Sequence, residues 1–101
     1  MPFQRAAKQS EIPVGTVREV HLQGQTIALA NVAGKFYALN NTCLHRGGPL
    51  GQGELSGTVL TCPWHGWQYQ VSTGQVTFNP EMRVATYPVE LRGDEVWVDA
   101  D

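Results

Sequence analysis

The segment NNTCLHRGGPLGQGELSGTVLTCPWHGWQYQVSTG (residues 40–74) decides how this chain folds. It holds both cysteines and two of the three histidines of the chain, among closely spaced glycines. From residue 40 to residue 80 the apolar residues show little periodicity, so this glycine-rich stretch has too little apolar pattern to form a hydrophobic core of its own. Such a segment is either a floppy loop, or it is organised by something other than hydrophobic packing.

The cysteines and histidines of this segment fall into two short boxes. The first is Cys43 and His45, with one residue between them. The second is Cys62 and His65, with two residues between them, and 16 residues separate the boxes, which gives the pattern C-x-H-x16-C-x-x-H. Each box offers one thiolate and one imidazole. Two loops tied to a common inorganic centre would gain the order that a hydrophobic core does not supply.

The two boxes resemble the ligand boxes of a known family, the Rieske [2Fe–2S] proteins. The resemblance is carried by CLHRGG (residues 43–48) and CPWHGWQY (residues 62–69). The glycine after each box and the turn Ser72-Thr73-Gly74 are similar to the same family. A double box of mixed cysteine and histidine at this spacing is a strong signal, whereas a single C-x-x-H would be a weak one. The match is strong over residues 40–74 and looser in the flanking strands.

The resemblance implies one Rieske [2Fe–2S] cluster, with Cys43 and Cys62 on one iron and His45 and His65 on the other. With two thiolates and two neutral imidazoles, such a cluster has no net charge when it is oxidised, whereas four thiolates would leave two negative charges. An added electron therefore meets less repulsion, and the reduction potential rises into a window of about −150 to +300 mV. The implied chemistry is one-electron transfer, with no substrate bond made or broken at the cluster.

Five further residues are expected around such a cluster. Rieske proteins of respiratory and photosynthetic cytochrome complexes carry a disulfide and a serine hydroxyl near the cluster, and the corresponding positions here are Gly48, Trp64 and Trp67. Tyr69 occupies the place of a tyrosine that hydrogen-bonds a ligand sulfur in those proteins. Pro80 resembles a proline-bearing loop that covers the cluster, with an ordinary turn as the alternative. Because one donor is missing, we predict a potential in the lower part of the window.

The resemblance also implies how the site faces solvent. We expect His45 and His65 at the exposed tip, with the thiolate side buried. Trp64 and Trp67 adjoin the second box, where they would either shield the cluster from water or present an apolar docking face. The expected rim of the docking surface consists of Arg46, Pro49, Trp64 and Pro80.

Short β-prone runs with turn signals flank the segment on both sides. They are residues 17–22, 26–32, 35–39, 85–91 and 95–98. Glycine in the turns between them can adopt a positive φ, which favours hairpins. Short strands at this spacing indicate a small antiparallel sandwich or incomplete barrel, hence an all-β fold. The resemblance adds an inserted cluster-binding subdomain at about residues 41–80 within a single domain over residues 1–101.

Composition and charge narrow the class of protein. The chain has 101 residues, 42% of them hydrophobic and 16% charged, which is typical of one folded globular domain. The formal net charge of −2 argues against a nucleic-acid partner held by bulk electrostatics. No stretch approaches the roughly 18 apolar residues of a membrane span, and the N-terminus lacks the apolar core of a secretory signal. We therefore expect a soluble cytoplasmic protein with no membrane partner.

The pattern is closest to the Rieske ferredoxins and oxygenase subunits of bacterial ring-hydroxylating systems. Oxygenase subunits also need a large second domain, in which two histidines and a carboxylate bind a mononuclear iron. Only His21 is left over here, and the chain has no room for that domain. The resemblance therefore implies a monomeric electron carrier rather than an enzyme. It would pass electrons from a flavin-dependent NAD(P)H reductase to a terminal oxygenase.

Two alternatives remain open from the sequence. One is the small Rieske subunit of a reductase such as assimilatory nitrite reductase, which would co-purify with a large subunit. The other is a structural zinc module, since two cysteines and two histidines suit tetrahedral zinc. Zinc sites usually have two to four residues between paired ligands, however, and the first box has one.

Overall fold

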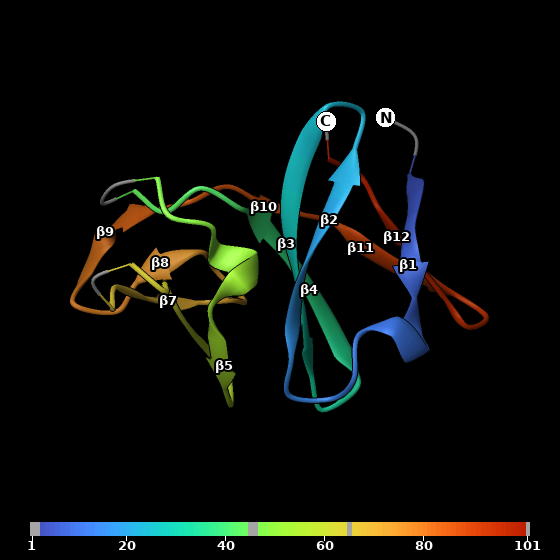
Figure 1. Ribbon diagram of the computed structural model, residues 1–101, viewed down its shortest axis with the longest axis horizontal. Helices are drawn as coiled ribbons and strands as arrows, with labels where there is room; N and C mark the ends of the chain where they lie inside the picture. Colours follow the sequence, from blue (N-terminus) through green and yellow to red (C-terminus); the bar gives the residue numbers. More distant parts are fainter. Residues whose placement is uncertain (1–2, 45–46, 65, 101) are drawn as a thin grey trace.

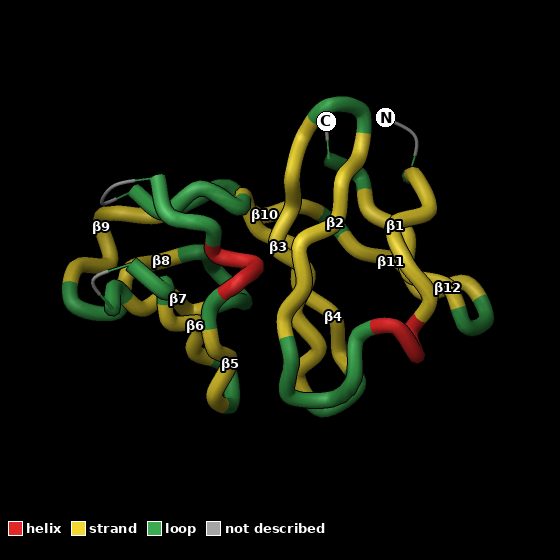
Figure 2. Tube along the Cα trace, in the orientation of Figure 1, coloured by secondary structure: helices red, strands yellow, loops and turns green. Residues whose placement is uncertain are grey.

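The computed structural model describes residues 3–44, 47–64 and 66–100, and that part of the chain consists mainly of β-strands (Figures 1 and 2). The strands form three antiparallel sheets, of four, three and five strands. Two short 3₁₀ turns are the only helical elements in the described ranges. No helix there is long and apolar enough to span a bilayer. The arrangement confirms the all-β antiparallel class expected from the sequence.

The four-stranded sheet lies between the other two (Figure 1). In spatial order its strands are β10 (Thr86–Tyr87), β4 (Lys35–Asn40), β3 (Gln25–Val32) and β2 (Val17–Leu22). Two-residue turns join the long strands, with φ of 47° and 79° at Gln23 and Gly24 and of 52° and 94° at Ala33 and Gly34. Such turns match the twist of antiparallel strands. The three strands predicted before residue 40 are therefore found within one residue of their expected ends.

The three-stranded sheet packs on the side of the central sheet away from the cysteine boxes. In spatial order it holds β1 (Gln4–Lys8), β12 (Glu95–Val98) and β11 (Val89–Arg92), and the 3₁₀ turn η1 (Gln9–Glu11) follows β1. Its outer strand β1 pairs with the last strand of the chain, with Gln4 opposite Val98. The buried residues of this half of the core are Ala7, Ile12, Leu22, Ile27, Leu29, Phe36, Ala38, Val96 and Val98.

The single strand predicted over residues 85–91 is wrong, because Pro88 divides it. Before the proline, Thr86 pairs with Leu39 in the central sheet. After it, Val89 pairs with Val98 in the three-stranded sheet. Proline has no N–H to donate and its φ is fixed, so a strand that passes through it loses a ladder bond. The chain uses that break to cross from one sheet to the other.

The five-stranded sheet lies on the opposite side of the central sheet. Its strands, in spatial order, are β5 (Glu54–Ser56), β6 (Val59–Thr61), β7 (Gln68–Gln70), β8 (Gln75–Val76) and β9 (Asn79–Arg83). The second 3₁₀ turn, η2 (Leu50–Gln52), precedes β5. The two cysteine boxes are the loops before η2 and between β6 and β7.

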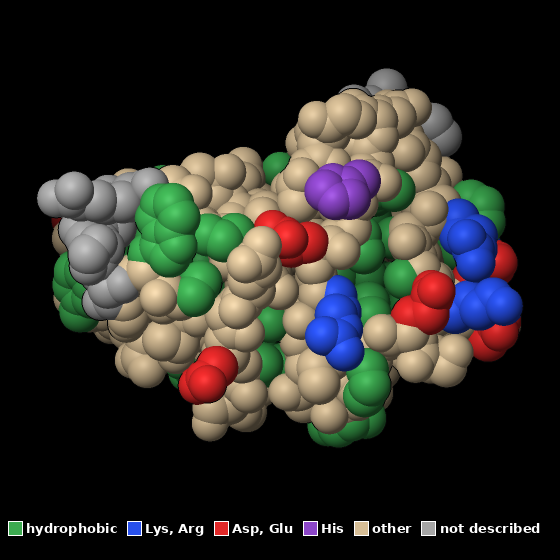
Figure 3. All heavy atoms as spheres, in the orientation of Figure 1, with side chains coloured by type: hydrophobic (Ala, Val, Ile, Leu, Met, Phe, Trp, Pro, Cys, Tyr) green, Lys and Arg blue, Asp and Glu red, His purple; other side chains and the backbone are tan. Residues whose placement is uncertain are grey.

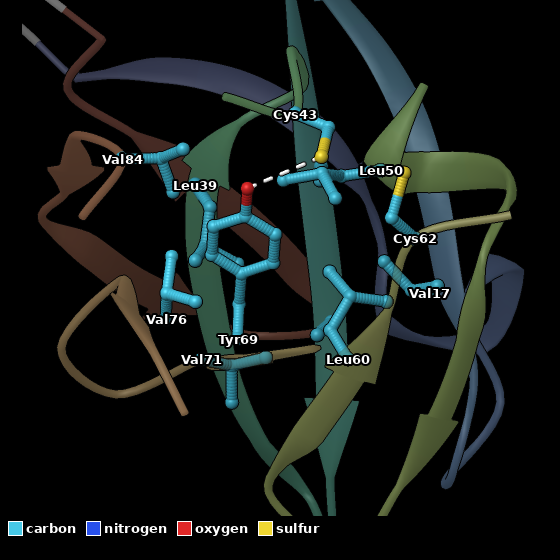
Figure 4. Packing of buried hydrophobic residues seen from close by; sticks show 12 residues of the cluster. Val17, Leu39, Cys43, Leu50, Leu60, Cys62, Tyr69, Val71, Val76 and Val84 are labelled. Atoms are coloured by element: carbon cyan, nitrogen blue, oxygen red, sulfur yellow. Dashed lines mark hydrogen bonds between the residues drawn. The ribbon is translucent and has the colours of Figure 1, made fainter. Parts of the chain in front are cut away.

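Hydrophobic packing contributes more to this region than its sequence predicts. Leu60, Tyr69, Val71 and Val76 are each at most 1% exposed, and they share one buried cluster with residues of the central sheet (Figure 4). The expectation of a segment without apolar packing is therefore wrong. Strands of two or three residues are too short to show the alternation that identifies a strand in a sequence.

Candidate metal centre

The first cysteine box is a tight loop closed by backbone hydrogen bonds. The amide of Cys43 donates to the carbonyl of Gly48 over 2.9 Å, and the amide of Gly47 donates to the carbonyl of Cys43 over 2.8 Å. At the base of the loop, the amide of Leu50 donates to the carbonyl of Asn41 over 2.7 Å. Gly47 has a φ of 71°, which favours glycine at this bend. The loop therefore holds Cys43, only 2% exposed, with its side chain directed into the core.

The second box is a similar loop between β6 and β7. The amide of Cys62 donates to the carbonyl of Trp67 over 2.7 Å, which closes the base of this loop. Gly66 turns the chain back with a φ of 75°. Cys62 is 1% exposed, whereas Trp64 at the end of the loop is 50% exposed.

The two cysteines are unbridged and face the same buried cluster (Figure 4). Burial raises the pKa of the Cys62 thiol, the backbone at Trp64 lowers it, and the neighbouring Cys43 thiol raises it again. A second negative charge beside the first is thus unfavourable unless a cation shares the site. A metal ion reverses this balance by holding thiolates directly. Two neighbouring buried sulfurs that lack a disulfide therefore fit a centre of soft metal ions.

Tyr69 is hydrogen-bonded to one of these two sulfurs. Its hydroxyl oxygen lies 3.2 Å from Cys43 Sγ and 3.0 Å from the amide nitrogen of Leu44 (Figure 4). Because the amide can only donate, the tyrosine oxygen accepts that bond. A Cys43 thiolate can only accept, so toward a thiolate the hydroxyl would donate its hydrogen to the sulfur. Burial first, and then the neighbouring Cys43, raise the pKa of Tyr69 above its usual range. The tyrosine is therefore neutral and able to donate to a Cys43 thiolate.

Gly48 brings the two loops into contact. A Cβ atom at this position would lie 2.9 Å from Cys62 Sγ and 3.0 Å from Cγ of Trp64. Any side chain here would collide with both the sulfur and the indole. The first loop therefore needs glycine for space, since this is where it passes over the second loop.

The two tryptophans of the second box have different surroundings. Trp67 is half-buried and packs on the core, with its ring 4.9 Å from that of Phe78 at an interplanar angle of 88°. Trp64 is half exposed, and two more large apolar side chains near the boxes, Leu44 and Phe78, are 47% and 63% exposed. Figure 3 shows apolar side chains at this end of the molecule. Trp67 thus stabilises the site from within, while Trp64 faces solvent.

Pro80 lies in strand β9 rather than in a covering loop. It is exposed, and its carbonyl accepts a hydrogen bond from Gln75 Nε2 over 3.2 Å. Strand β9 is the edge of its sheet, where the missing N–H of proline leaves no partner unsatisfied. Pro49, also expected on the rim, is half-buried and forms an isolated bridge with Thr42.

Several predicted site residues lie outside the part of the chain that the structure describes. These are the two expected histidine ligands and one rim residue, His45, His65 and Arg46. The neighbouring Cys43 and Cys62 are described, and the fold brings their loops together. His21 lies on β2, where its Nδ1 is 3.0 Å from Oγ1 of Thr26 on β3.

Sequence reasoning missed one group at the base of the first loop. Asn41 is 8% exposed, and its side chain joins Glu19 of β2 to the backbone of Gly51. Asn41 and Glu19 are 22 residues apart, so no local pattern links them.

Comparisons with known proteins agree with this arrangement. The sequence profile of the Rieske [2Fe–2S] domain matches residues 3–88. The ferredoxin component of the naphthalene 1,2-dioxygenase system of Pseudomonas aeruginosa is 37% identical over 90 residues, which cover 88% of this chain and 86% of the relative. The biphenyl dioxygenase ferredoxin subunit of Pseudomonas sp. (strain KKS102) is 34% identical over 101 residues, which cover 98% of this chain and 93% of the relative.

A solved structure shares the fold. It is a complex of reduced oxygenase and oxidised ferredoxin in carbazole 1,9a-dioxygenase, and the matched chain superposes with a TM-score of 0.86 at 32% identity. The match covers 95% of this chain and 91% of that chain, so the whole arrangement of sheets and loops is shared.

Proposed function

Because the chain belongs to the Rieske [2Fe–2S] domain family, we propose that Cys43 and Cys62 hold one iron of its cluster while His45 and His65 hold the other. The protein is an electron-transfer component of an oxygenase system, not an enzyme itself, and one Rieske [2Fe–2S] cluster supplies its one-electron chemistry. The observation that carries the ligand assignment is the pair of buried, unbridged cysteines on loops that Gly48 brings into contact.

The described residues around the sulfurs act in three ways. The core cluster excludes water from Cys43 and Cys62, since both are at most 2% exposed. Tyr69 donates a hydrogen bond that stabilises negative charge on Cys43. Backbone hydrogen bonds within each loop keep the cysteines in place. Gly48, Trp67 and Tyr69 are thus the described neighbours that we assign to the support of the cluster.

The electron acceptor in this proposal is a terminal oxygenase that docks at the cluster end of the molecule. The carbazole 1,9a-dioxygenase structure is a complex of an oxygenase with a ferredoxin of this fold, which supports a partner of the same kind. The exposed apolar side chains of Leu44, Trp64 and Phe78 supply the surface. Aromatic residues of this exposure are typical anchors of protein interfaces.

We also propose the electron donor and the setting. A flavin-dependent NAD(P)H reductase would reduce the cluster, because a one-electron carrier needs a donor that splits the electron pair of a nicotinamide. We propose that the carrier is a monomer in the cytoplasm, where nicotinamide cofactors are available.

Residues 1–101 would form one Rieske domain with a cluster-binding part at about residues 41–80. The support is the buried cluster that joins the central sheet to the cysteine loops, for example through Ala28, Leu39 and Leu60.

The experiment that tests this function is electron paramagnetic resonance of the anaerobically purified, dithionite-reduced protein. Iron and zinc are counted on the same sample. A rhombic signal with a low average g value and two irons per chain is expected, with a midpoint potential in the lower part of the Rieske window. A silent spectrum with one zinc per chain would instead establish the structural zinc module, and no electron transfer would follow.

A further inference from the structure

The base of the first cysteine loop contains a buried amide with both ends paired. Asn41 accepts a hydrogen bond at Oδ1 from the amide of Gly51, over 2.6 Å. It donates one from Nδ2 to a carboxylate oxygen of Glu19, over 2.7 Å. Burial of an amide without hydrogen bonds costs free energy, because the amide loses its bonds to water. Both partners are therefore needed to keep Asn41 in this position.

Glu19 comes from the central sheet, outside the cluster-binding segment. Its second carboxylate oxygen accepts a bond of 3.1 Å from Nε2 of Gln52, in the turn η2. Gly51 lies directly against it, since a Cβ at Gly51 would collide with Cγ of Glu19 and lie 2.9 Å from its backbone nitrogen. One carboxylate on β2 thus holds both ends of the first loop, Asn41 at its start and Gln52 after its end.

The hydrogen bonds of Glu19 with Asn41 and Gln52, which we call the clamp, are connected to the sulfur of Cys43 through the backbone of the loop. The carbonyl of Asn41 accepts from Leu50, and the amide of Cys43, two residues further on, donates to Gly48. Tyr69, by contrast, belongs to β7 of the five-stranded sheet. For the Tyr69 hydroxyl to lie 3.2 Å from Cys43 Sγ, the loop must be held at one place relative to that sheet.

We propose that Glu19 is a positioning residue for the cluster: its carboxylate fixes the base of the first ligand loop and thereby sets the hydrogen bond between Tyr69 and Cys43. This inference rests on the proposed role of Cys43 as a cluster ligand. It makes a residue 24 positions before that ligand a determinant of the reduction potential. The hydrogen bond favours the reduced, more negative state, so loss of the clamp lowers the potential.

The sign of the change in reduction potential distinguishes loss of the Glu19 hydrogen bonds from loss of its negative charge. Removing a negative charge near the cluster would by itself raise the potential, because the added electron meets less repulsion. Losing the Tyr69 hydrogen bond lowers it. Glu54 on β5 is an exposed acid whose side chain makes no hydrogen bond or ion pair with another described residue, so Glu54→Gln is the charge-matched control.

The test measures midpoint potential and resonance g values at one pH for Glu19→Ala, Glu19→Gln, Tyr69→Phe and the double variant Glu19→Ala/Tyr69→Phe. We expect Glu19→Ala to shift the potential downward, and to add no further downward shift when Tyr69→Phe is present, because both act on one bond. Glu19→Gln should keep the native g values and show no downward shift, only the small upward shift of a lost charge that Glu54→Gln also shows, since its amide oxygen can still accept from Asn41 and the exposed Gln52 can turn its own amide.

Three results would overturn the proposal. They are an unchanged or raised potential in Glu19→Ala, a shift of the same size with and without the Tyr69 hydroxyl, and a downward shift in Glu19→Gln as large as that in Glu19→Ala. If Glu19→Ala loses its cluster, Glu19→Asp, with a carboxylate one methylene shorter, takes its place with the same expected sign. The signal of the native protein is recorded first, so a failure of the cluster assignment itself is seen there and not in the variants.

Discussion

The hydroxyl of Tyr69 lies 3.2 Å from the sulfur of Cys43, although the two residues are 26 positions apart and belong to different elements. The bond spans the junction between the first cysteine loop and strand β7. The same hydroxyl oxygen accepts from the amide of Leu44, and it would donate its hydrogen to Cys43 when that cysteine is a thiolate ligand. This hydrogen bond therefore depends both on the charge of the ligand sulfur and on the position of the first cysteine loop relative to β7.

Substituting Tyr69 by Phe should lower the midpoint potential and leave the cluster bound. A hydrogen bond of this kind contributes about 1–1.5 kcal/mol. Since 59 mV of a one-electron couple corresponds to 1.4 kcal/mol, the expected fall is about 40–65 mV. A redox titration followed by resonance measures it.

Tyr87→Phe is the matched control for that titration. Tyr87 packs on the opposite core, between the central and three-stranded sheets, so removal of its hydroxyl should leave the potential unchanged. An unchanged potential in Tyr69→Phe would show that its hydroxyl does not act on the ligand sulfur.

Replacing either cysteine by serine should remove the cluster. A serine hydroxyl is a hard ligand that stays protonated at neutral pH, whereas the iron centre requires a soft thiolate. Cys43→Ser and Cys62→Ser are each expected to give colourless protein with little bound iron. Iron analysis and visible absorbance measure this. Full iron content in either variant would contradict the ligand assignment.

Gly48→Ala should lower the thermal stability of the protein with its cluster bound, without changing the oxygenase to which it passes electrons. The new methyl group would lie within 3.0 Å of both Cys62 Sγ and the Trp64 ring. Overpacking of this kind costs about 1–3 kcal/mol. Because 1 kcal/mol shifts Tm by about 4–8 °C in a domain of this size, the thermal loss of cluster absorbance should occur at least about 4 °C lower.

The double variant Gly48→Ala/Trp64→Ala is the companion measurement. It removes the indole from the collision but leaves the sulfur in place, so it should recover part of the lost Tm. No recovery would show that the clash with the indole adds nothing to the cost.

Trp64→Ala should weaken docking of the oxygenase while leaving the spectrum and potential unchanged. An aromatic anchor contributes about 2 kcal/mol or more to an interface, which corresponds to an affinity about 30-fold lower. The dependence of the oxygenase reduction rate on carrier concentration measures it. Leu91→Ala is the control, because Leu91 is similarly exposed at 46% but lies on β11. Loss of the cluster in Trp64→Ala would make this residue structural instead.

The sequence predicts the hairpins and the chemistry of the site for clear physical reasons. Glycines with positive φ mark two-residue turns, and the runs on either side of them consist largely of β-prone residues. The two boxes identify the metal centre because four soft and borderline ligands at this spacing have few other uses. The resemblance also selected Tyr69, whose hydroxyl lies within hydrogen-bond distance of Cys43.

The rest could not be predicted from local pattern. Strand β1 (QRAAK) has no β-branched or aromatic residue and exists because β12 pairs with it. Strand β8 has two residues and depends on the packing of its neighbours. The contact of Asn41 with Glu19 joins residues far apart in sequence, so only the folded chain reveals it.

The pairing of β1 with β12 has a practical consequence. It places Gln4 beside Val98, so both ends of the described chain lie near each other, in the half of the molecule away from the cysteine loops (Figure 1). Another domain, a tag or an electrode linker can therefore be fused at either end without covering the route of the electron. The same proximity permits a circular permutant, in which a short peptide joins the present ends and new ones open in an exposed hairpin turn.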